Sequence, residues 1–281
     1  MKELFKKKIA ISGATGGIGK ELCYYFCEMG ADLILMDRNF EKSNALKTKL
    51  EIDFPNVCIN LITLQLEDIE CVKTAVERLK VIEPDYIILN AGAYSIQRHK
   101  CDTGYDNVFQ INFVSPYYIA REMKDSIKRR NGKIIVVGSI AHNYSKIDVT
   151  DIDFSTRKKS SLVYGNAKRY LMFSLFGLFK GEKNLAVTHP GITFTNITAH
   201  YPKLIFAVIK HPMKIIFMKP KKAMLSIIGG IYNSCEEFEW IGPAIFDVWG
   251  KPKKKILKTC NKEEYQKICE IADSIYKKVK N

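Results

Sequence analysis

Short apolar runs alternate with segments of helical hydrophobic spacing along most of the chain. Each run is bounded by residues such as glycine, asparagine, aspartate or serine, which is typical of strands buried in a sheet. The strands predicted in this way are residues 9–12, 31–37, 57–64, 86–89, 133–137, 185–188 and 244–248. Because helices are expected between them, the pattern predicts an α/β protein with a doubly wound parallel sheet of about seven strands and helices on both faces.

The segments between these runs carry apolar residues at helical intervals. After the first strand, Ile18, Leu22 and Phe26 share one face of a predicted helix. The segment from Leu171 to Phe179 is apolar on more than one face, so its helix is expected to lie in the core or at a subunit contact. Further helices are predicted at residues 40–50, 68–79, 105–130, 164–180 and 221–233, and in the C-terminal segment that contains Tyr265, Ile268, Ala272, Ile275 and Val279.

A glycine-rich turn joins the first strand to the first helix. Its sequence, residues 12–19, is Ser-Gly-Ala-Thr-Gly-Gly-Ile-Gly. Strand, glycine turn and helix form the context of a dinucleotide-binding turn, because the glycines let the backbone approach a pyrophosphate at the helix N-terminus. We therefore expect a Rossmann-type fold that spans residues 1–281 as a single domain. The residues expected to contact the cofactor here are Ser12, Gly13, Thr15, Gly16, Gly17, Ile18 and Gly19.

The second strand ends in Asp37-Arg38, which bears on the choice of nucleotide. An acidic side chain about twenty residues after the turn accepts hydrogen bonds from the adenosine ribose and would repel a 2′-phosphate. Arg38 would instead attract that phosphate, but no basic residue within the glycine turn adds to it. The sequence therefore favours NAD over NADP as the cofactor, and NADP stays open.

Tyr164 and Lys168 are four residues apart in a predicted helix and so lie on one face of it. An ammonium beside a phenol favours the phenolate, so the pKa of Tyr164 is expected to fall from its usual value of about 10. Tyr164 would then act as a proton donor and acceptor. An isolated pair of this kind is more often a buried aromatic side chain beside a solvated lysine, so the assignment depends on the other motifs.

The formal net charge of +14 permits binding to anionic surfaces, although lysines spread along a chain more often belong to solvated faces. No nucleic-acid-binding pattern is visible, so no nucleic-acid partner is expected. The eight cysteines form no Cys-x-x-Cys pair, and His142 and His189 have no partner at ligand spacing, so no metal is predicted. The sequence shows no long apolar run and no secretory signal, which favours a reduced, cytoplasmic location.

Taken in order, the motifs resemble those of the short-chain dehydrogenase/reductase family. The resemblance covers roughly residues 8–200, and the order of the set is more specific than any one motif. Besides the glycine turn, the set comprises Asn90-Ala91-Gly92, Asn112, Ser139, Tyr164-x-x-x-Lys168, and Pro190-Gly191 with Thr195.

The resemblance implies an NAD(P)-dependent oxidoreductase that interconverts an alcohol and its carbonyl. In it, Tyr164 would be the acid and base, Lys168 would bind the nicotinamide ribose, and Ser139 would hydrogen-bond the substrate oxygen. Asn112 would hold a water molecule that links Lys168 to solvent, and Thr195 would meet the nicotinamide carboxamide. The other cofactor contacts are expected from Asp37, Arg38, Gln65, Leu66, Asn90, Ala91, Gly92, Tyr164, Lys168, Pro190, Gly191 and Thr193.

The stretch from Ser139 to Tyr164 is longer than in the commonest members and carries an insertion at residues 147–153. It is similar to the retinol-dehydrogenase-like branch, which implies a hydrophobic substrate such as a steroid, retinoid or lipid. The apolar residues 192–222 are expected to cover that substrate. Packing in the core, or weak peripheral contact with a membrane, are the alternatives for this segment.

Further expectations concern the assembly and two departures from the family pattern. The resemblance implies a homodimer or homotetramer. Residues 251–281 are expected to form a basic C-terminal extension with a helix. Ser12 replaces the usual threonine, and Gln65 stands where an aspartate often contacts the adenine amino group.

Three other interpretations belong to different functional classes. An epimerase or dehydratase acting on sugar nucleotides would show differently spaced glycines and a larger C-terminal domain. A non-catalytic NAD(P)-binding module that reports redox state would tend to lose the tyrosine–lysine pair. A peripheral membrane or nucleic-acid binder is suggested by the positive charge alone. A peripheral membrane-associated lipid-modifying reductase is an alternative within the resemblance.

Overall fold

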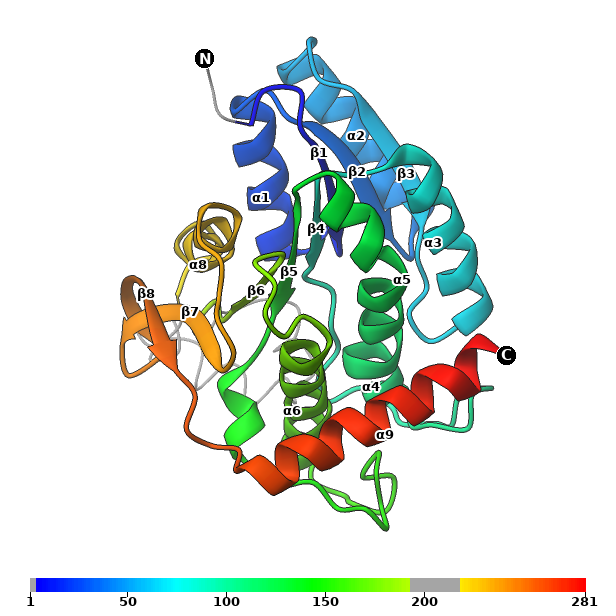
Figure 1. The fold of residues 1–281 in the computed structure, drawn as a ribbon. Coiled ribbons are helices and arrows are strands. Elements are labelled where there is room, and N and C mark those ends of the chain that lie inside the picture. Colours follow the sequence, from blue (N-terminus) through cyan, green and yellow to red (C-terminus); the bar gives the residue numbers. More distant parts are fainter. Residues whose placement is uncertain (1–3, 193–217) are drawn as a thin grey trace, which may run out of the picture.

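The computed structural model describes residues 4–192 and 218–281, which form an α/β fold around one central sheet (Figure 1). The described strands lie in the order β3-β2-β1-β4-β5-β6-β7-β8. The pairings from β3 through β7 are parallel, and only β8 runs antiparallel to its neighbour β7. The order reverses between β1 and β4, and ligands of such sheets bind at this switch point, beyond the carboxyl ends of the strands.

The strands are β1 (Lys8–Ser12), β2 (Asp32–Asp37), β3 (Ile59–Thr63), β4 (Tyr86–Leu89), β5 (Lys133–Val137), β6 (Leu185–Thr188), β7 (Glu239–Ile245) and β8 (Trp249–Ile256). The helices are α1 (Gly17–Glu28), α2 (Phe40–Asp53), α3 (Ile69–Ile82), α4 (Asn107–Phe109), α5 (Ser115–Arg129), α6 (Ser160–Leu178), α8 (Pro220–Tyr232) and α9 (Lys262–Lys280). Two irregular helical turns complete them, the π-turn η1 (Gln110–Val114) and the 3-10 turn η2 (Ile140–Asn143).

The alternation of side chains along the strands supplies two separate hydrophobic cores. Ile9 and Ile11 of β1 pack with residues of α1, α2 and α8 on one face of the sheet. Ala10 between them faces the other side, where α3, α5 and α6 pack. Period-two alternation in a strand that is apolar on both sides predicts this three-layer arrangement. The predicted fold class, a doubly wound sheet with helices on both faces, is therefore confirmed.

The described sheet has eight strands, whereas about seven were expected. The strand predicted at residues 244–248 is misplaced: residues 244–245 end β7, whereas Phe246 and Asp247 adopt φ values of 50° and 55° and form the turn between β7 and β8. Strand β8 was missed because it is rich in lysine and contains Pro252. Such residues are typical of an exposed edge strand, which they protect from pairing with another chain.

The single helix predicted at residues 105–130 is three elements in the structure, α4, η1 and α5. The π-turn η1 contains Asn112, which is fully buried. A π-turn inserts an extra residue into a helix and is common at functional sites. Hydrophobic periodicity does not distinguish a π-turn from an α-helix, so the turn was not predicted.

Helix α9 crosses α6, as Figure 1 shows, and covers its outer face. Ile268 and Ala272 of α9 are fully buried in the same core as Leu171 and Phe176 of α6. This intrachain packing accounts for the helix that is apolar all round, so a subunit contact is not needed to explain it. The expected basic extension at residues 251–281 is thus strand β8 followed by a packed helix.

The glycine turn depends on close backbone packing. Gly13 has a φ of +68°, and a Cβ atom at Gly19 would lie 2.0 Å from the Gly13 carbonyl oxygen. No methyl group fits at that distance, so Gly19 fixes the contact between the start of α1 and the end of β1.

Replacing Gly19 by alanine should lower the free energy of unfolding by about 2 kcal/mol or more, because the turn has to open. The matched control is Gly229→Ala in α8, where the nearest atom, of Ile241, is 3.3 Å from the added Cβ. Both changes gain the same helix propensity, so the control should stay within about 1 kcal/mol of the parent. Denaturant unfolding measures both, and equal stabilities would contradict the packing argument.

Candidate active site

A cavity of about 620 Å³ lies at the carboxyl ends of the central strands. Its size is within the range of about 300–1,000 Å³ that is typical of ligand sites. Residues from the glycine turn line one end, and Ser139, Tyr164 and Lys168 line the other. The two groups of motif residues, far apart in the sequence, therefore face one continuous space.

The glycine turn is held in place by Asp37 at the end of β2. Its carboxylate accepts hydrogen bonds from the backbone nitrogen of Thr15 at 3.1 Å and from the Thr15 hydroxyl at 2.9 Å. Its second oxygen accepts a hydrogen bond from the Ser43 hydroxyl at 3.0 Å. These contacts order the turn, and the expected role of Asp37 in binding a ribose stays a prediction. The neighbouring Arg38 is exposed and lines the cavity.

Ser12 joins the ends of β1 and β4. Its hydroxyl oxygen accepts hydrogen bonds from the backbone nitrogens of Asn90 and Ala91, each at 3.0 Å. The Asn90 side chain in turn donates to the carbonyls of Ser12 and Gly13, at 3.0 and 3.3 Å. The serine that replaces the usual threonine therefore still links the two strand ends through its hydroxyl. This buried hydroxyl holds the residues that follow β4 against the glycine turn. Ser12 itself does not line the cavity.

Asn112 lies behind the cavity wall and pins the turn that follows β4. Its amide nitrogen donates to the carbonyls of Ala93 and Val108, both at 2.8 Å, and its oxygen accepts from the Ala93 nitrogen at 3.2 Å. A Cβ at Gly92 would lie 2.7 Å from the Asn112 oxygen and 3.7 Å from the Lys168 nitrogen. The glycine therefore lets the amide and the ammonium approach each other.

Helix α6 brings Tyr164 and Lys168 to the cavity, where η2 presents Ser139. The Lys168 nitrogen donates to the Val137 carbonyl at 2.9 Å and lies 5.7 Å from the centre of the Tyr164 ring. The Ser139 side chain lines the same cavity as Tyr164 and favours its ionised form, which by itself lowers the pKa of the phenol. The predicted convergence of hydroxyl, phenol and ammonium is present in the structure.

The electrostatics of this group differ from the expectation. Burial raises the pKa of Tyr164 to about 12, although the Ser139 side chain opposes the shift. Burial also lowers the pKa of Lys168 to about 8. The expected fall in the tyrosine pKa is therefore wrong for the protein as described, because desolvation outweighs the nearby ammonium.

Aromatic and aliphatic side chains that the sequence motifs did not include form the wall beside Tyr164. The Tyr94 ring packs edge-on against the Tyr164 ring, with 5.4 Å between their centres. Ile96, Ile140 and Tyr144 also line this end of the cavity. Tyr94 follows the Asn90-Ala91-Gly92 motif closely, and this position was the available signal for it.

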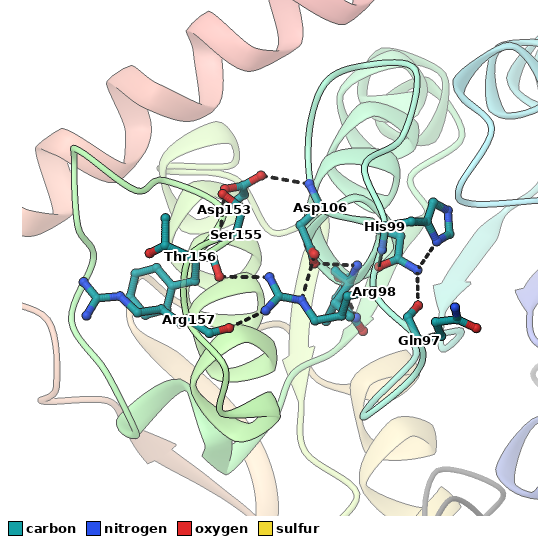
Figure 2. A network of polar contacts seen from close by, with 12 residues as sticks. Gln97, Arg98, His99, Asp106, Asp153, Ser155, Thr156 and Arg157 are labelled. Carbon is teal, nitrogen blue, oxygen red and sulfur yellow. Dashed lines mark hydrogen bonds and ion pairs between the residues drawn. The ribbon is translucent and has the colours of Figure 1, made fainter.

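Arg98 connects this wall to the segment that directly follows the inserted stretch. Figure 2 shows it reaching from its loop toward Asp106, to which its Nε donates at 2.8 Å, and toward residues 153–157. Its terminal nitrogens donate to the carbonyls of Phe154, at 2.9 Å, and Arg157. Asp153 accepts a hydrogen bond from the Asp106 nitrogen at 2.8 Å. The insertion therefore supports the loop that carries Tyr94.

Both histidines near the site are buried and neutral, because burial lowers the pKa of each to about 4. His142 is hydrogen-bonded to the Ser139 carbonyl at 2.7 Å and to the Thr259 hydroxyl at 3.1 Å. His189 stacks on Trp240 with 4.9 Å between ring centres. Within residues 4–192 and 218–281, no cluster of side chains has the make-up of a metal site.

The structure gathers most of the predicted site residues around the cavity. Gly19 and Asn112 shape it from behind, and Thr193 and Thr195 lie outside the described residues, as does most of segment 192–222. The predicted residues that line the cavity are Gly13, Thr15, Gly16, Gly17, Ile18, Asp37, Arg38, Gln65, Leu66, Asn90, Ala91, Gly92, Ser139, Tyr164, Lys168, Pro190 and Gly191.

Comparison with known proteins agrees with this geometry. The family model "short chain dehydrogenase" matches residues 7–150, which is about half of the chain. The chain belongs to the short chain dehydrogenase family, whose members are oxidoreductases that bind NAD or NADP.

Among individual proteins, the chain is similar to retinol dehydrogenase 12 of Mus musculus, with 28% identity over 68% of this chain and 63% of that protein. It is also similar to short chain dehydrogenase rstn4 of Aspergillus nomiae, with 26% identity over 69% of this chain and 61% of that protein. The matches thus span about three fifths of these relatives. The similarity to a retinol-dehydrogenase-like branch is confirmed.

A solved structure with a similar fold is the NADPH-dependent 3-quinuclidinone reductase of Rhodotorula rubra. Its identity to this chain is 22%, with 80% of this chain and 86% of that one covered and a TM-score of 0.61. Among the helices of the described ranges, none has the length and apolar character needed to cross a bilayer.

The buried ammonium gives a prediction about stability and pH. Because the pKa of Lys168 falls from 10.5 to about 8 on folding, charging it costs the folded state about 3 kcal/mol below pH 8. The unfolded chain binds more protons between pH 8 and 10.5, so this penalty is relieved as the pH rises. Lys168→Met should therefore be more stable than the parent at pH 7, with the difference shrinking toward pH 10.

Urea unfolding at several pH values measures this difference, and Lys124→Met is the control. Lys124 also lies on a helix but is partly exposed and paired with Glu182. A difference for Lys168→Met that stays constant from pH 7 to 10 would contradict the assigned burial of the charge.

Proposed function

We propose that this protein is an NAD(P)-dependent oxidoreductase that interconverts a hydrophobic alcohol and its carbonyl, with Tyr164 as the acid and base. The observation that carries the proposal is the convergence of Ser139, Tyr164 and Lys168 at one end of a cavity whose other end is the glycine turn. A tyrosine that shares the cavity with a serine hydroxyl and lies beside a buried ammonium suits proton transfer to a substrate oxygen.

The residues at the other end of the cavity fit a dinucleotide. Gly16, the N-cap of α1, makes no side-chain cap, and the first turn of α1 has no acidic residue, so its amides are suited to a pyrophosphate. Gly13, Gly16 and Gly17 line the cavity without side chains, so a ligand can approach their backbone closely. When bound, a nicotinamide would supply or accept the hydride.

The side chains around Tyr164 would handle the proton. Because the pKa of Tyr164 is raised to about 12, the phenol keeps its proton at neutral pH and suits the direction of carbonyl reduction. Tyr164 would give this proton to the carbonyl oxygen while the Ser139 hydroxyl donates a hydrogen bond to the same oxygen. The Lys168 ammonium would stabilise the phenolate left behind. A water held by Asn112 would return the proton.

The wall beside Tyr164 supports a hydrophobic substrate. Tyr94, Ile96, Ile140 and Tyr144 present apolar or aromatic surface within the cavity. Burial of such surface favours a steroid, retinoid or lipid-like carbonyl over a small polar one. One of the similar proteins is named retinol dehydrogenase 12, and retinol belongs to this substrate class.

The assembly and location of the protein are part of the same proposal. A homodimer or homotetramer in the cytoplasm, with at most weak peripheral membrane contact, remains our prediction. Because α9 covers the outer face of α6, the apolar residues of α6 no longer argue for a subunit contact. The prediction of an oligomer therefore rests on the family resemblance.

Replacing Tyr164 by phenylalanine should reduce turnover by about 10²–10⁴-fold, because the proton donor is lost. Affinity for NADH and NADPH, measured by fluorescence titration, should stay within about twofold. The assay is nucleotide consumption with a panel of steroid, retinoid, lipid and small keto compounds. The matched control is Tyr144→Phe, which removes a hydroxyl from the same cavity and should keep most activity. Undiminished turnover of Tyr164→Phe would remove its assigned role.

The choice of nucleotide depends on two adjacent side chains of opposite charge. The buried Asp37 carboxylate would repel a 2′-phosphate, so we retain NAD as the preferred cofactor. Two observations favour NADP as an accepted alternative. Asp37 is already occupied by three hydrogen bonds from Thr15 and Ser43, and Arg38 is exposed at the cavity.

Arg38→Ala should weaken NADPH binding by about tenfold or more, because a charge-assisted hydrogen bond to phosphate is lost. NADH binding should change less than about twofold, since NADH has no 2′-phosphate. Fluorescence titration at two salt concentrations gives both affinities. Lys20→Ala, an exposed charge in α1, is the control for net charge. An unchanged ratio of the two affinities would exclude Arg38 from nucleotide selection.

A further inference from the structure

One arginine of the catalytic helix is fully buried and has no role in the proton transfer described above. Arg169 follows Lys168 directly on α6 and is 1% exposed. Its side chain forms a two-pronged ion pair with Glu264 of α9, with Nε to Oε1 at 2.8 Å and Nη2 to Oε2 at 2.6 Å. A buried charge of this kind is costly unless its hydrogen bonds are satisfied, so its partners indicate what it holds together.

The remaining hydrogen bonds of the guanidinium lead to the turn that carries Ser139. Nη1 donates to the His142 carbonyl at 3.0 Å, and Nη2 donates to the Thr259 carbonyl at 2.5 Å. His142 and Thr259 are joined to each other through the imidazole Nε2 and the Thr259 hydroxyl. The imidazole Nδ1 is hydrogen-bonded to the Ser139 carbonyl. An unbroken chain of contacts therefore leads from Glu264 of α9 to Ser139.

The tautomer of His142 is set by these contacts. A carbonyl oxygen only accepts hydrogen bonds, so Nδ1 must carry the proton and donate to Ser139. Nε2 then accepts the hydroxyl proton of Thr259. His142 is thus a fixed spacer between the Ser139 backbone and the segment before α9.

The η2 turn packs closely against α6 next to Tyr164, so the position of the turn affects the position of the tyrosine. A Cβ at Gly165, the residue after Tyr164, would lie 2.3 Å from the Ala141 carbonyl oxygen of the η2 turn. The turn therefore sits directly on α6 beside Tyr164. Glu264 also accepts a hydrogen bond from the Ile147 nitrogen at 3.1 Å, which holds the chain after the turn.

We propose that Arg169 and Glu264 are positioning residues: their buried ion pair, acting through His142, fixes the Ser139 hydroxyl against Tyr164. This inference rests on the proposed function. It makes the C-terminal helix part of the catalytic machinery, although none of its residues lines the cavity. Glu264 and Arg169 both lie beyond residues 7–150, the part matched by the family model.

The test is Glu264→Gln, which keeps the shape of the side chain and removes its charge. The substrate is a carbonyl compound of the panel above that the parent protein reduces. We expect kcat with it to fall by about 10- to 100-fold, because a small misplacement of a reacting group has effects of this size. The dissociation constants of NADH and NADPH should stay within twofold. Backbone amides of residues 139–144 should exchange hydrogen faster, as measured by mass spectrometry, with β1 and β4 unchanged.

The matched control is the pair Arg121→Met/Asp273→Leu. These residues also anchor α9, with 2.6 Å between Arg121 Nη2 and Asp273 Oδ1, but they tie it to α5, away from Ser139. This variant should lose similar stability and keep kcat within twofold of the parent. An equal loss of kcat in both variants would mean that attachment of α9 alone matters, and it would overturn the proposal.

A second variant covers the case in which Glu264→Gln does not fold. Thr259→Val removes the hydroxyl that contacts His142 and keeps the size of the side chain, and it should also speed exchange at residues 139–144. Unchanged exchange there, or unchanged kcat in a folded Glu264→Gln, would overturn the proposal. Hydrogen exchange needs no turnover, so it decides the positioning role even if Tyr164→Phe shows that the proposed function is wrong.

Discussion

The buried ammonium of Lys168 is the constraint on which the site depends. It is 3% exposed, and its hydrogen bond to the Val137 carbonyl at the end of β5 compensates part of its desolvation. That bond sets the distance between α6 and the sheet at the point where the central strands end. Gly92 is the residue that lets the Asn112 amide approach the same ammonium. At Gly92, the absence of a side chain therefore follows from the need to accommodate this charge.

Helix α6 satisfies three demands at once, which explains its unusual composition. One face carries Tyr164 and Lys168 to the cavity, a second packs on the sheet, and a third lies under α9. A helix with three buried faces has no room for a polar stripe, so its hydrophobic periodicity is lost. Arg169 is charged within these apolar surroundings, and its ion pair with Glu264 and its carbonyl partners make its burial tolerable.

The sequence predicted the glycine-turn side of the cavity better than the wall beside Tyr164. The glycine turn, Asn90-Ala91-Gly92 and the Tyr164–Lys168 pair act through local backbone geometry, which short motifs record. The wall around Tyr94 depends on Arg98, whose carbonyl partners, Phe154 and Arg157, lie more than fifty residues away in the chain. Tertiary contacts over such separations leave no periodic trace. The shifted tyrosine pKa was mispredicted for a related reason, because desolvation depends on packing that the sequence does not show.

The Arg98 contacts also bear on how the substrate end of the cavity is built. Asp106 both accepts from Arg98 and donates its backbone nitrogen to Asp153, so the two loops are cross-linked at more than one point. Phe154 packs in a small separate core that Ile96 and Tyr164 border. A change in the length of the insertion would therefore move the wall beside Tyr164 and leave the glycine turn untouched. The wall beside Tyr164 and the glycine turn are in this way held by separate sets of contacts.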